Sequence, residues 1–150
     1  MKEEAEGKVL ALDWGSKRMG IALSDPGAEI AFGRESYDRK GLEQDLQFLR
    51  GLVEEEKVKA VVIGLPLRMN GERGKQAEEV LRFKKALEEE LSSVVDKVET
   101  VDERLTSNEA ERVMLQADLS RARRKEKRDQ LAATLILQRY LDRKEKEGGS

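Results

Sequence analysis

Apolar residues in the first third of the chain form short uninterrupted runs, which predict strands. The first predicted strand covers residues 8–13 and the second covers residues 20–24. The connection between them is so short that it predicts an antiparallel hairpin. A weaker run over residues 29–36 follows the turn at Asp25-Pro26-Gly27 and predicts a third strand.

The middle of the chain alternates between helical and strand patterns. Apolar residues recur at helical spacing in two segments: Leu42, Leu46, Leu49 and Val53, then Val80, Phe83, Leu87 and Leu91. The first set predicts a helix over residues 41–56, and the second predicts another helix. Residues 60–64 are wholly apolar and rich in β-branched side chains, as in a central parallel strand. Residues 97–101 add a short strand.

The last third is predicted to be helical. Thr106 and Glu109 form a capping box for a third helix, and a final helix covers residues 127–143. Residues 1–6 and 144–150 are polar and are predicted to be mobile tails.

This order of elements predicts an α/β fold in a single domain over residues 1–150. Three antiparallel strands followed by parallel β-α units make a five-stranded mixed sheet with helices on both faces. The sequence contains no internal repeat and no compositional break that would mark a second domain.

Composition narrows the chemistry available to the protein. Hydrophobic residues make up 38% of the 150 residues and charged residues 40%, and there is no cysteine and no histidine. Disulfide scaffolds and thiolate metal sites are excluded, which fits a reducing compartment. The polar N-terminus does not resemble a signal peptide, and no apolar run approaches the ~20 residues of a membrane helix. We therefore predict a cytoplasmic protein.

Three acidic residues stand out as candidates for catalysis: Asp13, Glu103 and Asp129. Asp13 ends an apolar strand, where a carboxylate is costly to bury unless it is paired or binds a metal. A turn-capping aspartate is the alternative. Without histidine or cysteine, carboxylates around a hard divalent cation are the natural route to chemistry in this chain.

Asp129 begins the apolar face of the predicted final helix. With Ala133, Ile136 and Tyr140 it falls on one side of that helix. An acid at the start of a buried stripe indicates a functional group. The alternative is an acid in the first helical turn, favoured by the helix dipole.

Glu103 and Asp102 point in opposite directions in an extended segment, so only one of them can easily face a given site. Arg104 could hold a phosphate bidentately or could pair with Asp102.

Trp14 could stack on a base, but a place in the core is the stronger prediction.

Basic residues are concentrated in one segment. Residues 121–128 contain six basic residues and one acid, although the net charge of the chain is −2. Such a run can bind a polyanion or can be a solvated helix face. The predicted nucleic-acid contacts come from this run, the 14–19 connection, the 66–75 loop and the segment after the last strand: Lys17, Arg18, Arg68, Arg104, Arg123, Arg124, Lys125, Lys127 and Arg128.

Four blocks of the sequence together carry a family resemblance. They are DWGSKRMGIA at 13–22, IGLPLRMNG at 63–71, DERLTS at 102–107 and KRDQLAATLILQRYL at 127–141. In this order and spacing they resemble the YqgF/RuvX family of pre-16S rRNA nucleases and Holliday-junction-resolvase-like proteins, within the ribonuclease H superfamily. The chain departs from the family pattern at Met19, where a β-branched residue is usual, and at Arg128, where an apolar one is usual. Neither departure removes a carboxylate.

The resemblance implies a ribonuclease H-like fold, an acidic triad of Asp13, Glu103 and Asp129, and maturation of the 5′ end of 16S rRNA. Our hypothesis is hydrolysis of phosphodiester bonds with Mg²⁺ or Mn²⁺, as two ions held by the triad. The expected partner is an rRNA precursor or ribosomal particle, with branched DNA as the alternative substrate. Both a monomer and a homodimer stay open.

Two other classes compete with a nuclease. Asp13-Trp14-Gly15 before a second strand also resembles the phosphate loop of sugar kinases and actin-like ATPases, but those proteins close two lobes over a nucleotide and 150 residues supply one. A non-catalytic nucleic-acid-binding module would explain the basic run. It would not explain inward-facing acids, which repel phosphate.

Overall fold

In this computed structural model of the chain, the described residues are 7–66, 70–102 and 121–148, without the side chains of 121–127, 129 and 145–148. The elements in this part of the chain are β1 (Lys8–Trp14), β2 (Arg18–Ser24), β3 (Ala31–Asp38), α1 (Leu42–Glu56), β4 (Val58–Leu65), α2 (Lys75–Leu91), β5 (Lys97–Asp102) and α4 (Arg121–Gly148). The predicted third helix around Thr106 lies outside the described residues.

The strands form one five-stranded sheet in the order β3-β2-β1-β4-β5. β1 pairs antiparallel with β2, and β2 pairs antiparallel with β3. β4 lies parallel to β1 on one side and to β5 on the other. The predicted mixed sheet is therefore confirmed, including the hairpin and the central position of the apolar strand β4.

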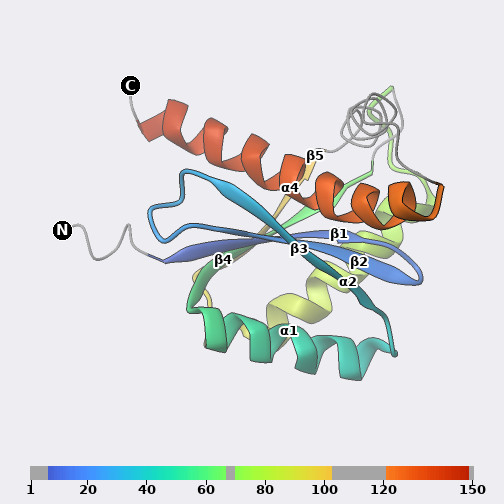
Figure 1. Cartoon of the computed structure of the whole chain (residues 1–150). Coiled ribbons are helices and arrows are strands. Elements are labelled where there is room, and N and C mark those ends of the chain that lie inside the picture. Colours follow the sequence, from blue (N-terminus) through green and yellow to red (C-terminus); the bar gives the residue numbers. More distant parts are fainter. Residues whose placement is uncertain (1–6, 67–69, 103–120, 149–150) are drawn as a thin grey trace.

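Each face of the sheet has its own core, because successive strand residues point to opposite sides. Leu10 and Leu12 pack with α1 and α2 in the larger core. Val9 and Ala11 pack with α4 in the smaller core. Figure 1 shows α4 on one side of the sheet and α1 and α2 on the other. Below, these sides are called the α4 face and the α1/α2 face.

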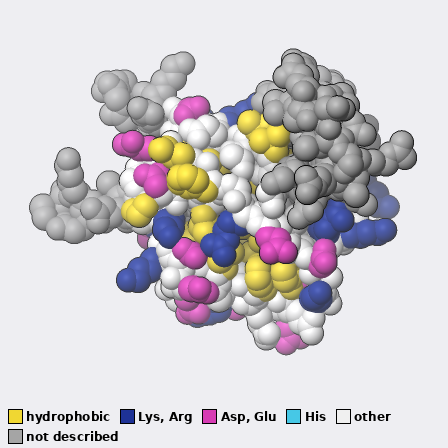
Figure 2. All heavy atoms as spheres, in the orientation of Figure 1, with side chains coloured by type: hydrophobic (Ala, Val, Ile, Leu, Met, Phe, Trp, Pro, Cys, Tyr) yellow, Lys and Arg dark blue, Asp and Glu magenta, His cyan; other side chains and the backbone are white. Residues whose placement is uncertain are grey.

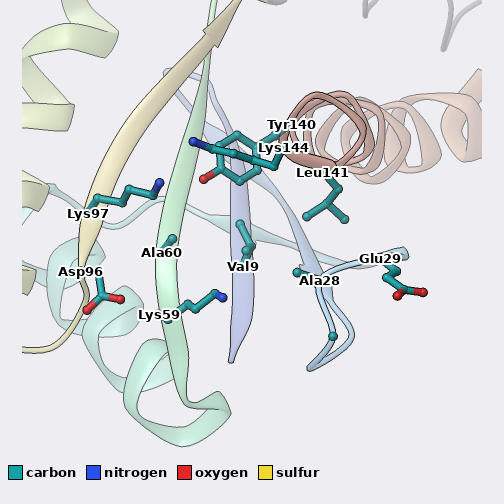
Figure 3. Close-up of a pocket in the computed structure, with 11 residues that line it drawn as sticks. Val9, Ala28, Glu29, Lys59, Ala60, Asp96, Lys97, Tyr140, Leu141 and Lys144 are labelled. Carbon is teal, nitrogen blue, oxygen red and sulfur yellow. The ribbon is translucent and has the colours of Figure 1, made fainter. Parts of the chain in front are cut away.

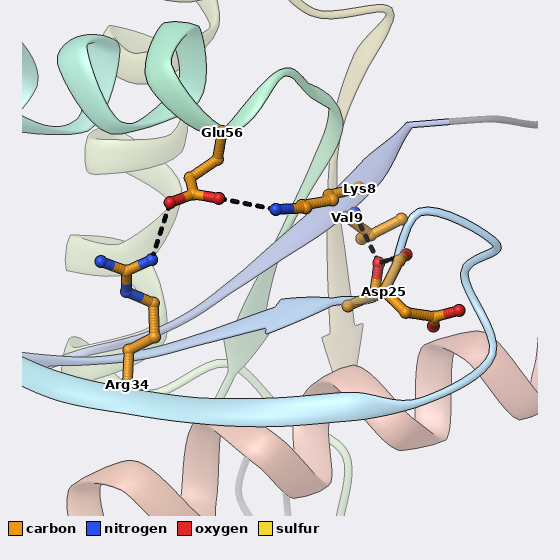
Figure 4. Close-up of polar contacts among 6 residues, drawn as sticks. Lys8, Val9, Asp25, Arg34 and Glu56 are labelled. Atoms are coloured by element: carbon orange, nitrogen blue, oxygen red, sulfur yellow. Dashed lines mark hydrogen bonds and ion pairs between the residues drawn. The ribbon is translucent and has the colours of Figure 1, made fainter.

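Polar contacts hold the start of β1 in place (Figure 4). Lys8 Nζ lies 2.7 Å from Glu56 Oε1 at the end of α1, and Arg34 Nη1 of β3 lies 3.0 Å from Glu56 Oε2. The Val9 N–H donates to the buried Ser24 Oγ at 2.8 Å, and that hydroxyl donates to the Asp25 carbonyl. Both contacts link β1 to neighbouring elements at the amino end of the strand.

The third strand lies two residues later than predicted, at 31–38 rather than 29–36. The Asp25 carboxylate accepts the N–H groups of Glu29 and Ile30, each at 2.8 Å, so the turn extends through residue 30. Ala28 within this turn has a left-handed backbone with φ of 57°. Side-chain capping of the turn, rather than apolar pattern, therefore determines where the strand starts.

Helix α4 is longer than the predicted 127–143 and runs from Arg121 to Gly148. The apolar pattern marks only the part that packs on the sheet. Arginine, lysine and glutamate are good helix formers, so the helix continues through charged residues at both ends. The mobility predicted for residues 144–150 stays a prediction. Among the described residues, no helix combines the length and apolar character needed to cross a membrane.

Candidate active site

Asp13 lies at the carboxyl end of β1, in the middle of the sheet. It is half-buried and pairs with Gly20 of β2 in the antiparallel ladder. Val9 and Ala11 face α4, so Asp13, two residues further along the strand, lies on the α4 face as well. Trp14, the next residue, belongs to the opposite core.

Glycines flank Asp13 on both neighbouring strands. Gly20 lies opposite it on β2, and Ala22 of β2 belongs to the α4 core, so position 20 is on the same face. On β4, Gly64 follows Ile63, the partner of Leu12. Neither neighbour brings a side chain beside the carboxylate. The sequence pattern did not reveal this row, because Gly64 reads simply as the end of an apolar strand.

Asp102 ends β5 at the same edge of the sheet, two strands away from Asp13. Its partner in the parallel ladder is Leu65 of β4. Val101 belongs to the α4 core, whereas Val98 belongs to the α1/α2 core. Strand alternation therefore places Asp102 on the α1/α2 face, away from Asp13. Glu103, the predicted catalytic residue, lies outside the described residues.

Two contacts show which way α4 crosses the sheet. Gln138 Oε1 accepts the N–H of Ala31 at the start of β3. A methyl group added at Gly33, further along β3, would lie 2.8 Å from Thr134 Oγ1. β3 runs in the same direction as β1, because each of them is antiparallel to β2. Residues of α4 with lower numbers therefore lie nearer the carboxyl end of β1. Gly33 pairs with Ala22 of β2, which in turn pairs with Ala11. Asp13 is two residues further toward that edge, about 7 Å along the strand.

Asp129 lies in the amino-terminal half of α4, which is the half nearer the carboxyl end of β1. Position 129 precedes the fully buried Ala133 by four residues and Ile136 by seven, and it is on the same helix face. The helix begins at Arg121, eight residues earlier, and its first turn contains no acid. The first-turn dipole role for Asp129 is therefore wrong. Its side chain lies outside the described part of the chain.

The predicted nucleic-acid contacts are distributed unevenly over the described structure. Lys17 is exposed in the turn after β1, and Arg18 is half-buried at the start of β2. Arg128 is half-buried in α4. The backbone of the remaining basic run lies in the first turns of α4, with side chains that are not described: Arg123, Arg124, Lys125 and Lys127. Arg68 and Arg104 lie outside the described residues.

Arg39 holds the turn that follows Asp13. Its guanidinium donates to the carbonyls of Gly15 and Ser16 at 3.2 and 3.3 Å, and to Asp45 Oδ2 at 2.8 Å. It also lies 4.7 Å from the centre of the Trp14 ring. Trp14 is 8% exposed, which confirms its predicted place in the core.

Asp45 anchors this network from the first turn of α1. It is fully buried, and its second oxygen accepts the Lys40 N–H at 2.8 Å. Burial by itself raises the pKa of Asp45, but the Lys40 N–H and the Arg39 guanidinium hold that pKa below its usual value. The predictions from sequence did not include this residue. The available signal was its spacing, four residues before the buried Leu49.

The hollow drawn in Figure 3 lies at the other end of the sheet. It has a volume of about 460 Å³ and is lined by residues at the amino ends of the parallel strands, including Val9 and Ala60, and by Tyr140 of α4. The Tyr140 hydroxyl donates to Glu99 Oε2 at 3.0 Å, and Lys97 Nζ lies 3.2 Å from the same oxygen. The polar groups of Tyr140, Glu99 and Lys97 are thus partners of one another. Asp13 lies at the opposite edge of the sheet, so this hollow is separate from the candidate active site.

The surroundings of Asp13 suit a hard divalent cation. Carboxylate oxygens are the ligands that Mg²⁺ and Mn²⁺ prefer, and the residues that flank Asp13 on β2 and β4 are glycines, which add no side chain beside it. Within the described part of the chain, no three candidate metal-binding side chains lie together. Of the predicted triad, only the side chain of Asp13 belongs to that part.

Sequence comparison connects this site to known proteins. Residues 7–143 match the family model described as "RuvX: Holliday junction resolvase". A "Putative pre-16S rRNA nuclease" from Syntrophomonas wolfei is 51% identical over 135 residues, which cover 90% of this chain and 94% of that protein. A protein of the same description from Clostridium kluyveri is 46% identical over 136 residues, covering 91% and 97%.

Comparison of structures agrees on the fold. The chain is similar to T. thermophilus RuvC in complex with Holliday junction substrate, with a TM-score of 0.55 and 12% identity over 92% of this chain and 95% of that one. A second structure of Thermus thermophilus RuvC gives a TM-score of 0.50 with 16% identity. At this identity the likeness concerns the fold alone, which is ribonuclease H-like. From the extent of the family match and the identity to its relatives, the chain belongs to the RuvX family.

Proposed function

We propose that this protein is a divalent-metal-dependent nuclease that hydrolyses phosphodiester bonds, with Asp13, Glu103 and Asp129 as its catalytic acids. The observation that carries the proposal is the position of Asp13. It is a half-buried carboxylate at the carboxyl edge of a ribonuclease H-like sheet, flanked by two glycines and lying on the face that α4 covers.

Strand alternation and helix periodicity support the other two acids. Position 129 lies on the sheet-facing side of α4, in the part of the helix nearest the carboxyl edge of β1. Asp102 is on the face opposite Asp13, so a continued extended chain would bring Glu103 to the α4 face. This supports Glu103 over Asp102 as the third acid.

The triad would hold Mg²⁺ or Mn²⁺, as two ions. Bound divalent ions supply the positive charge that activates water and stabilises the departing 3′ oxygen. Asp13 contributes oxygen ligands from a rigid central strand, and the Arg39–Asp45 network keeps the adjoining turn in place. Carboxylates held on rigid elements limit the reorganisation that catalysis needs.

Nucleic acid would approach from the carboxyl edge. Lys17 and Arg18 lie beside Asp13 in sequence, and the basic start of α4 leads to Asp129. Arg68 and Arg104 belong to segments that follow β4 and β5, whose ends lie at that edge. Neutralisation of backbone phosphates by these residues predicts affinity that weakens steeply with salt.

The favoured substrate is the 5′ region of pre-16S rRNA, which gives the protein a role in ribosome biogenesis in the cytoplasm. Support comes from the relatives that carry the description of pre-16S rRNA nuclease at 46–51% identity and nearly full length. The second candidate is branched DNA. It is favoured by the description of the family model as a Holliday junction resolvase.

The decisive experiment compares Asp13→Asn with the wild type on a structured pre-16S rRNA fragment and on a four-way DNA junction, each with Mg²⁺ or Mn²⁺. We expect cleavage by the variant to fall to background, with folding and RNA retention largely unchanged. Asp96→Asn, the same substitution at an exposed residue on the opposite edge, is the matched control. Wild-type metal-dependent cleavage by Asp13→Asn would show that Asp13 is not catalytic.

A further inference from the structure

Among the described residues, helices cover only part of the α1/α2 face of the sheet. α1 and α2 pack mainly against each other, β4 and β5, while β2 and β3 extend beyond them. Phe32 of β3 pairs with Leu23 of the α1/α2 core and so lies on this face, with 54% of its surface exposed. Phe48 of α1 is 38% exposed. Large apolar side chains therefore reach solvent beside α1.

A groove of about 590 Å³ lies between α1 and β3. One wall is a face of α1 with residues four apart, Gln47, Gly51 and Glu55, and the other wall is the segment from Arg34 to Tyr37. The rings of Tyr37 and Phe48 stack in the groove with their centres 4.0 Å apart. Figure 2 shows this side of the molecule, with exposed hydrophobic side chains among charged ones.

Gly51 is an unusual residue for this wall. It lies inside α1, where glycine weakens a helix relative to alanine. A Cβ atom added there would meet no atom within 4 Å, so no packing contact with the described residues requires glycine. A glycine on a groove wall does allow another backbone to approach closely. The open space over Gly51 therefore supports a docking role for this wall of the groove.

Charge restricts what that molecule can be. Glu35 and Glu55 line the groove, and its basic residue, Arg34, is paired with Glu56 at 3.0 Å (Figure 4). The balance is acidic, which attracts a cationic partner and repels nucleic acid. The groove thus differs in charge from the segment of basic sequence at the start of α4.

The shape of the groove favours a helix over a strand. β3 is an edge strand, but it carries one extra residue between Arg34 and Tyr37 relative to Ile21 and Met19 of β2. Such a bulge interrupts the regular edge that an added strand needs. In contrast, a helix from another molecule could lie beside α1 and extend the helical layer formed by α1 and α2. The small residue Gly51 would allow the two helices to pack closely.

We infer that the groove between α1 and β3 binds an amphipathic helix of a partner protein. The apolar face of that helix packs over Gly51, Phe48 and Tyr37, and its flanking lysine or arginine residues lie against Glu35 and Glu55. This surface is separate from the proposed nuclease site, so the inference does not depend on the proposed nuclease activity.

The test begins with a photo-cross-linking amino acid at Gln47, in the full-length protein produced in its native host. The same amino acid at Ser93, an exposed neutral position after α2, is the control. The cross-linked segment is identified by mass spectrometry, synthesised as a peptide, and titrated against purified protein. We expect a protein segment with apolar residues at helical spacing and a net positive charge.

Binding of that peptide should weaken about tenfold or more in Gly51→Trp, which fills the groove, and in Glu55→Lys, which reverses its charge. Ser93→Trp should bind as the wild type does. Cleavage of RNA by all three variants should be unchanged, which separates loss of docking from loss of the nuclease.

Several results would overturn the inference. These are adducts no stronger than at Ser93, adducts with a second copy of the chain or with nucleic acid, and a segment without basic helical character. Peptide binding that is equal in wild type, Gly51→Trp and Glu55→Lys would also do so. Because Glu55→Lys changes only an exposed side chain, its result holds even if Gly51→Trp folds poorly.

Discussion

Asp13 faces Gly20 across the β1–β2 ladder, so the only side chain of this residue pair is the carboxylate. Opposed residues in an antiparallel pair have Cβ positions about 5 Å apart. Any side chain at position 20 would therefore stand beside the Asp13 carboxylate on the α4 face. The hairpin thus pairs the carboxylate with a residue that has no side chain.

Gly20→Ala should reduce metal-dependent cleavage roughly tenfold to a hundredfold, because a methyl group beside Asp13 would displace the metal ion that we propose Asp13 binds. Nucleic-acid retention on a filter should change little. Gly20 is buried, so thermal unfolding must be measured alongside. Full activity in a well-folded variant would mean that the space beside Asp13 has no catalytic use.

Gly33→Ala should destabilise the protein by about 1–3 kcal/mol, since the added methyl group would lie 2.8 Å from Thr134 Oγ1 and force α4 away from β3. Thr134→Ala removes that oxygen. The double variant should therefore lose less stability than the sum of the single variants, measured by urea unfolding. Strict additivity would contradict a close contact between β3 and α4.

Asp45 should give the protein a specific sensitivity to acid. Its pKa is lowered in the folded state, so its contribution to stability is complete above the unfolded value of about 3.9 and is lost as pH falls through the lower folded value. The difference in unfolding free energy between wild type and Asp45→Asn should therefore be constant from neutral pH to about pH 5 and shrink below about pH 4.

Removal of the partner of Asp45 should be more harmful than removal of a partly exposed ion pair. Arg39→Ala leaves a fully buried carboxylate without its guanidinium and should cost about 3 kcal/mol. Lys84→Ala, which removes an i,i+4 pair with Glu88 on α2, should cost less than about 0.5 kcal/mol. Chemical denaturation of both variants tests the contrast, and equal losses would contradict it.

The basic start of α4 should contribute to nucleic-acid affinity through charge. Replacing Arg123 and Arg124 by alanine should weaken binding and reduce the slope of log K against log[salt] by about one unit for each phosphate that the helix no longer neutralises. Filter binding at several salt concentrations measures the slope. An unchanged slope would mean that this part of the helix is only a solvated face.

Gly51→Ala should stabilise the protein by about 0.5–1 kcal/mol, because alanine favours the helix and the added methyl group meets open space. The midpoint of urea unfolding measures this gain. A loss of stability would mean that the groove wall has a structural need for glycine within the chain, which would remove one support for the docking surface.

The pattern of the sequence was sufficient for the sheet. Uninterrupted apolar runs predict β1, β2 and β4 because strands buried on both faces have no polar side, and the short connection after Asp13 leaves only a hairpin. The pattern failed where polar side chains determine the boundary. Asp25 delays the start of β3, and charged residues of high helix propensity extend α4 beyond its apolar face.

The candidate site, like the fold, was predicted from the sequence only in part. The sequence alone made Asp13 a candidate, because it is a carboxylate at the end of an apolar strand, and its catalytic role stays a prediction. The four blocks carry the family resemblance that the comparisons confirm. The catalytic roles of Glu103 and Asp129 stay predictions too. The Arg39–Asp45 network and the glycines on either side of Asp13 join residues that are distant in sequence, and no periodicity marks them.

By itself, the sequence determined the order of strands and helices and the kinds of side chain available for chemistry, because propensity, apolar spacing and composition are local properties. Only the tertiary structure decided that Gly20 and Gly64 flank Asp13, that Asp102 lies on the other face, and that the α1–β3 groove is acidic. These features depend on strand register and on the way each helix crosses the sheet. Both are set by packing between segments far apart in the chain.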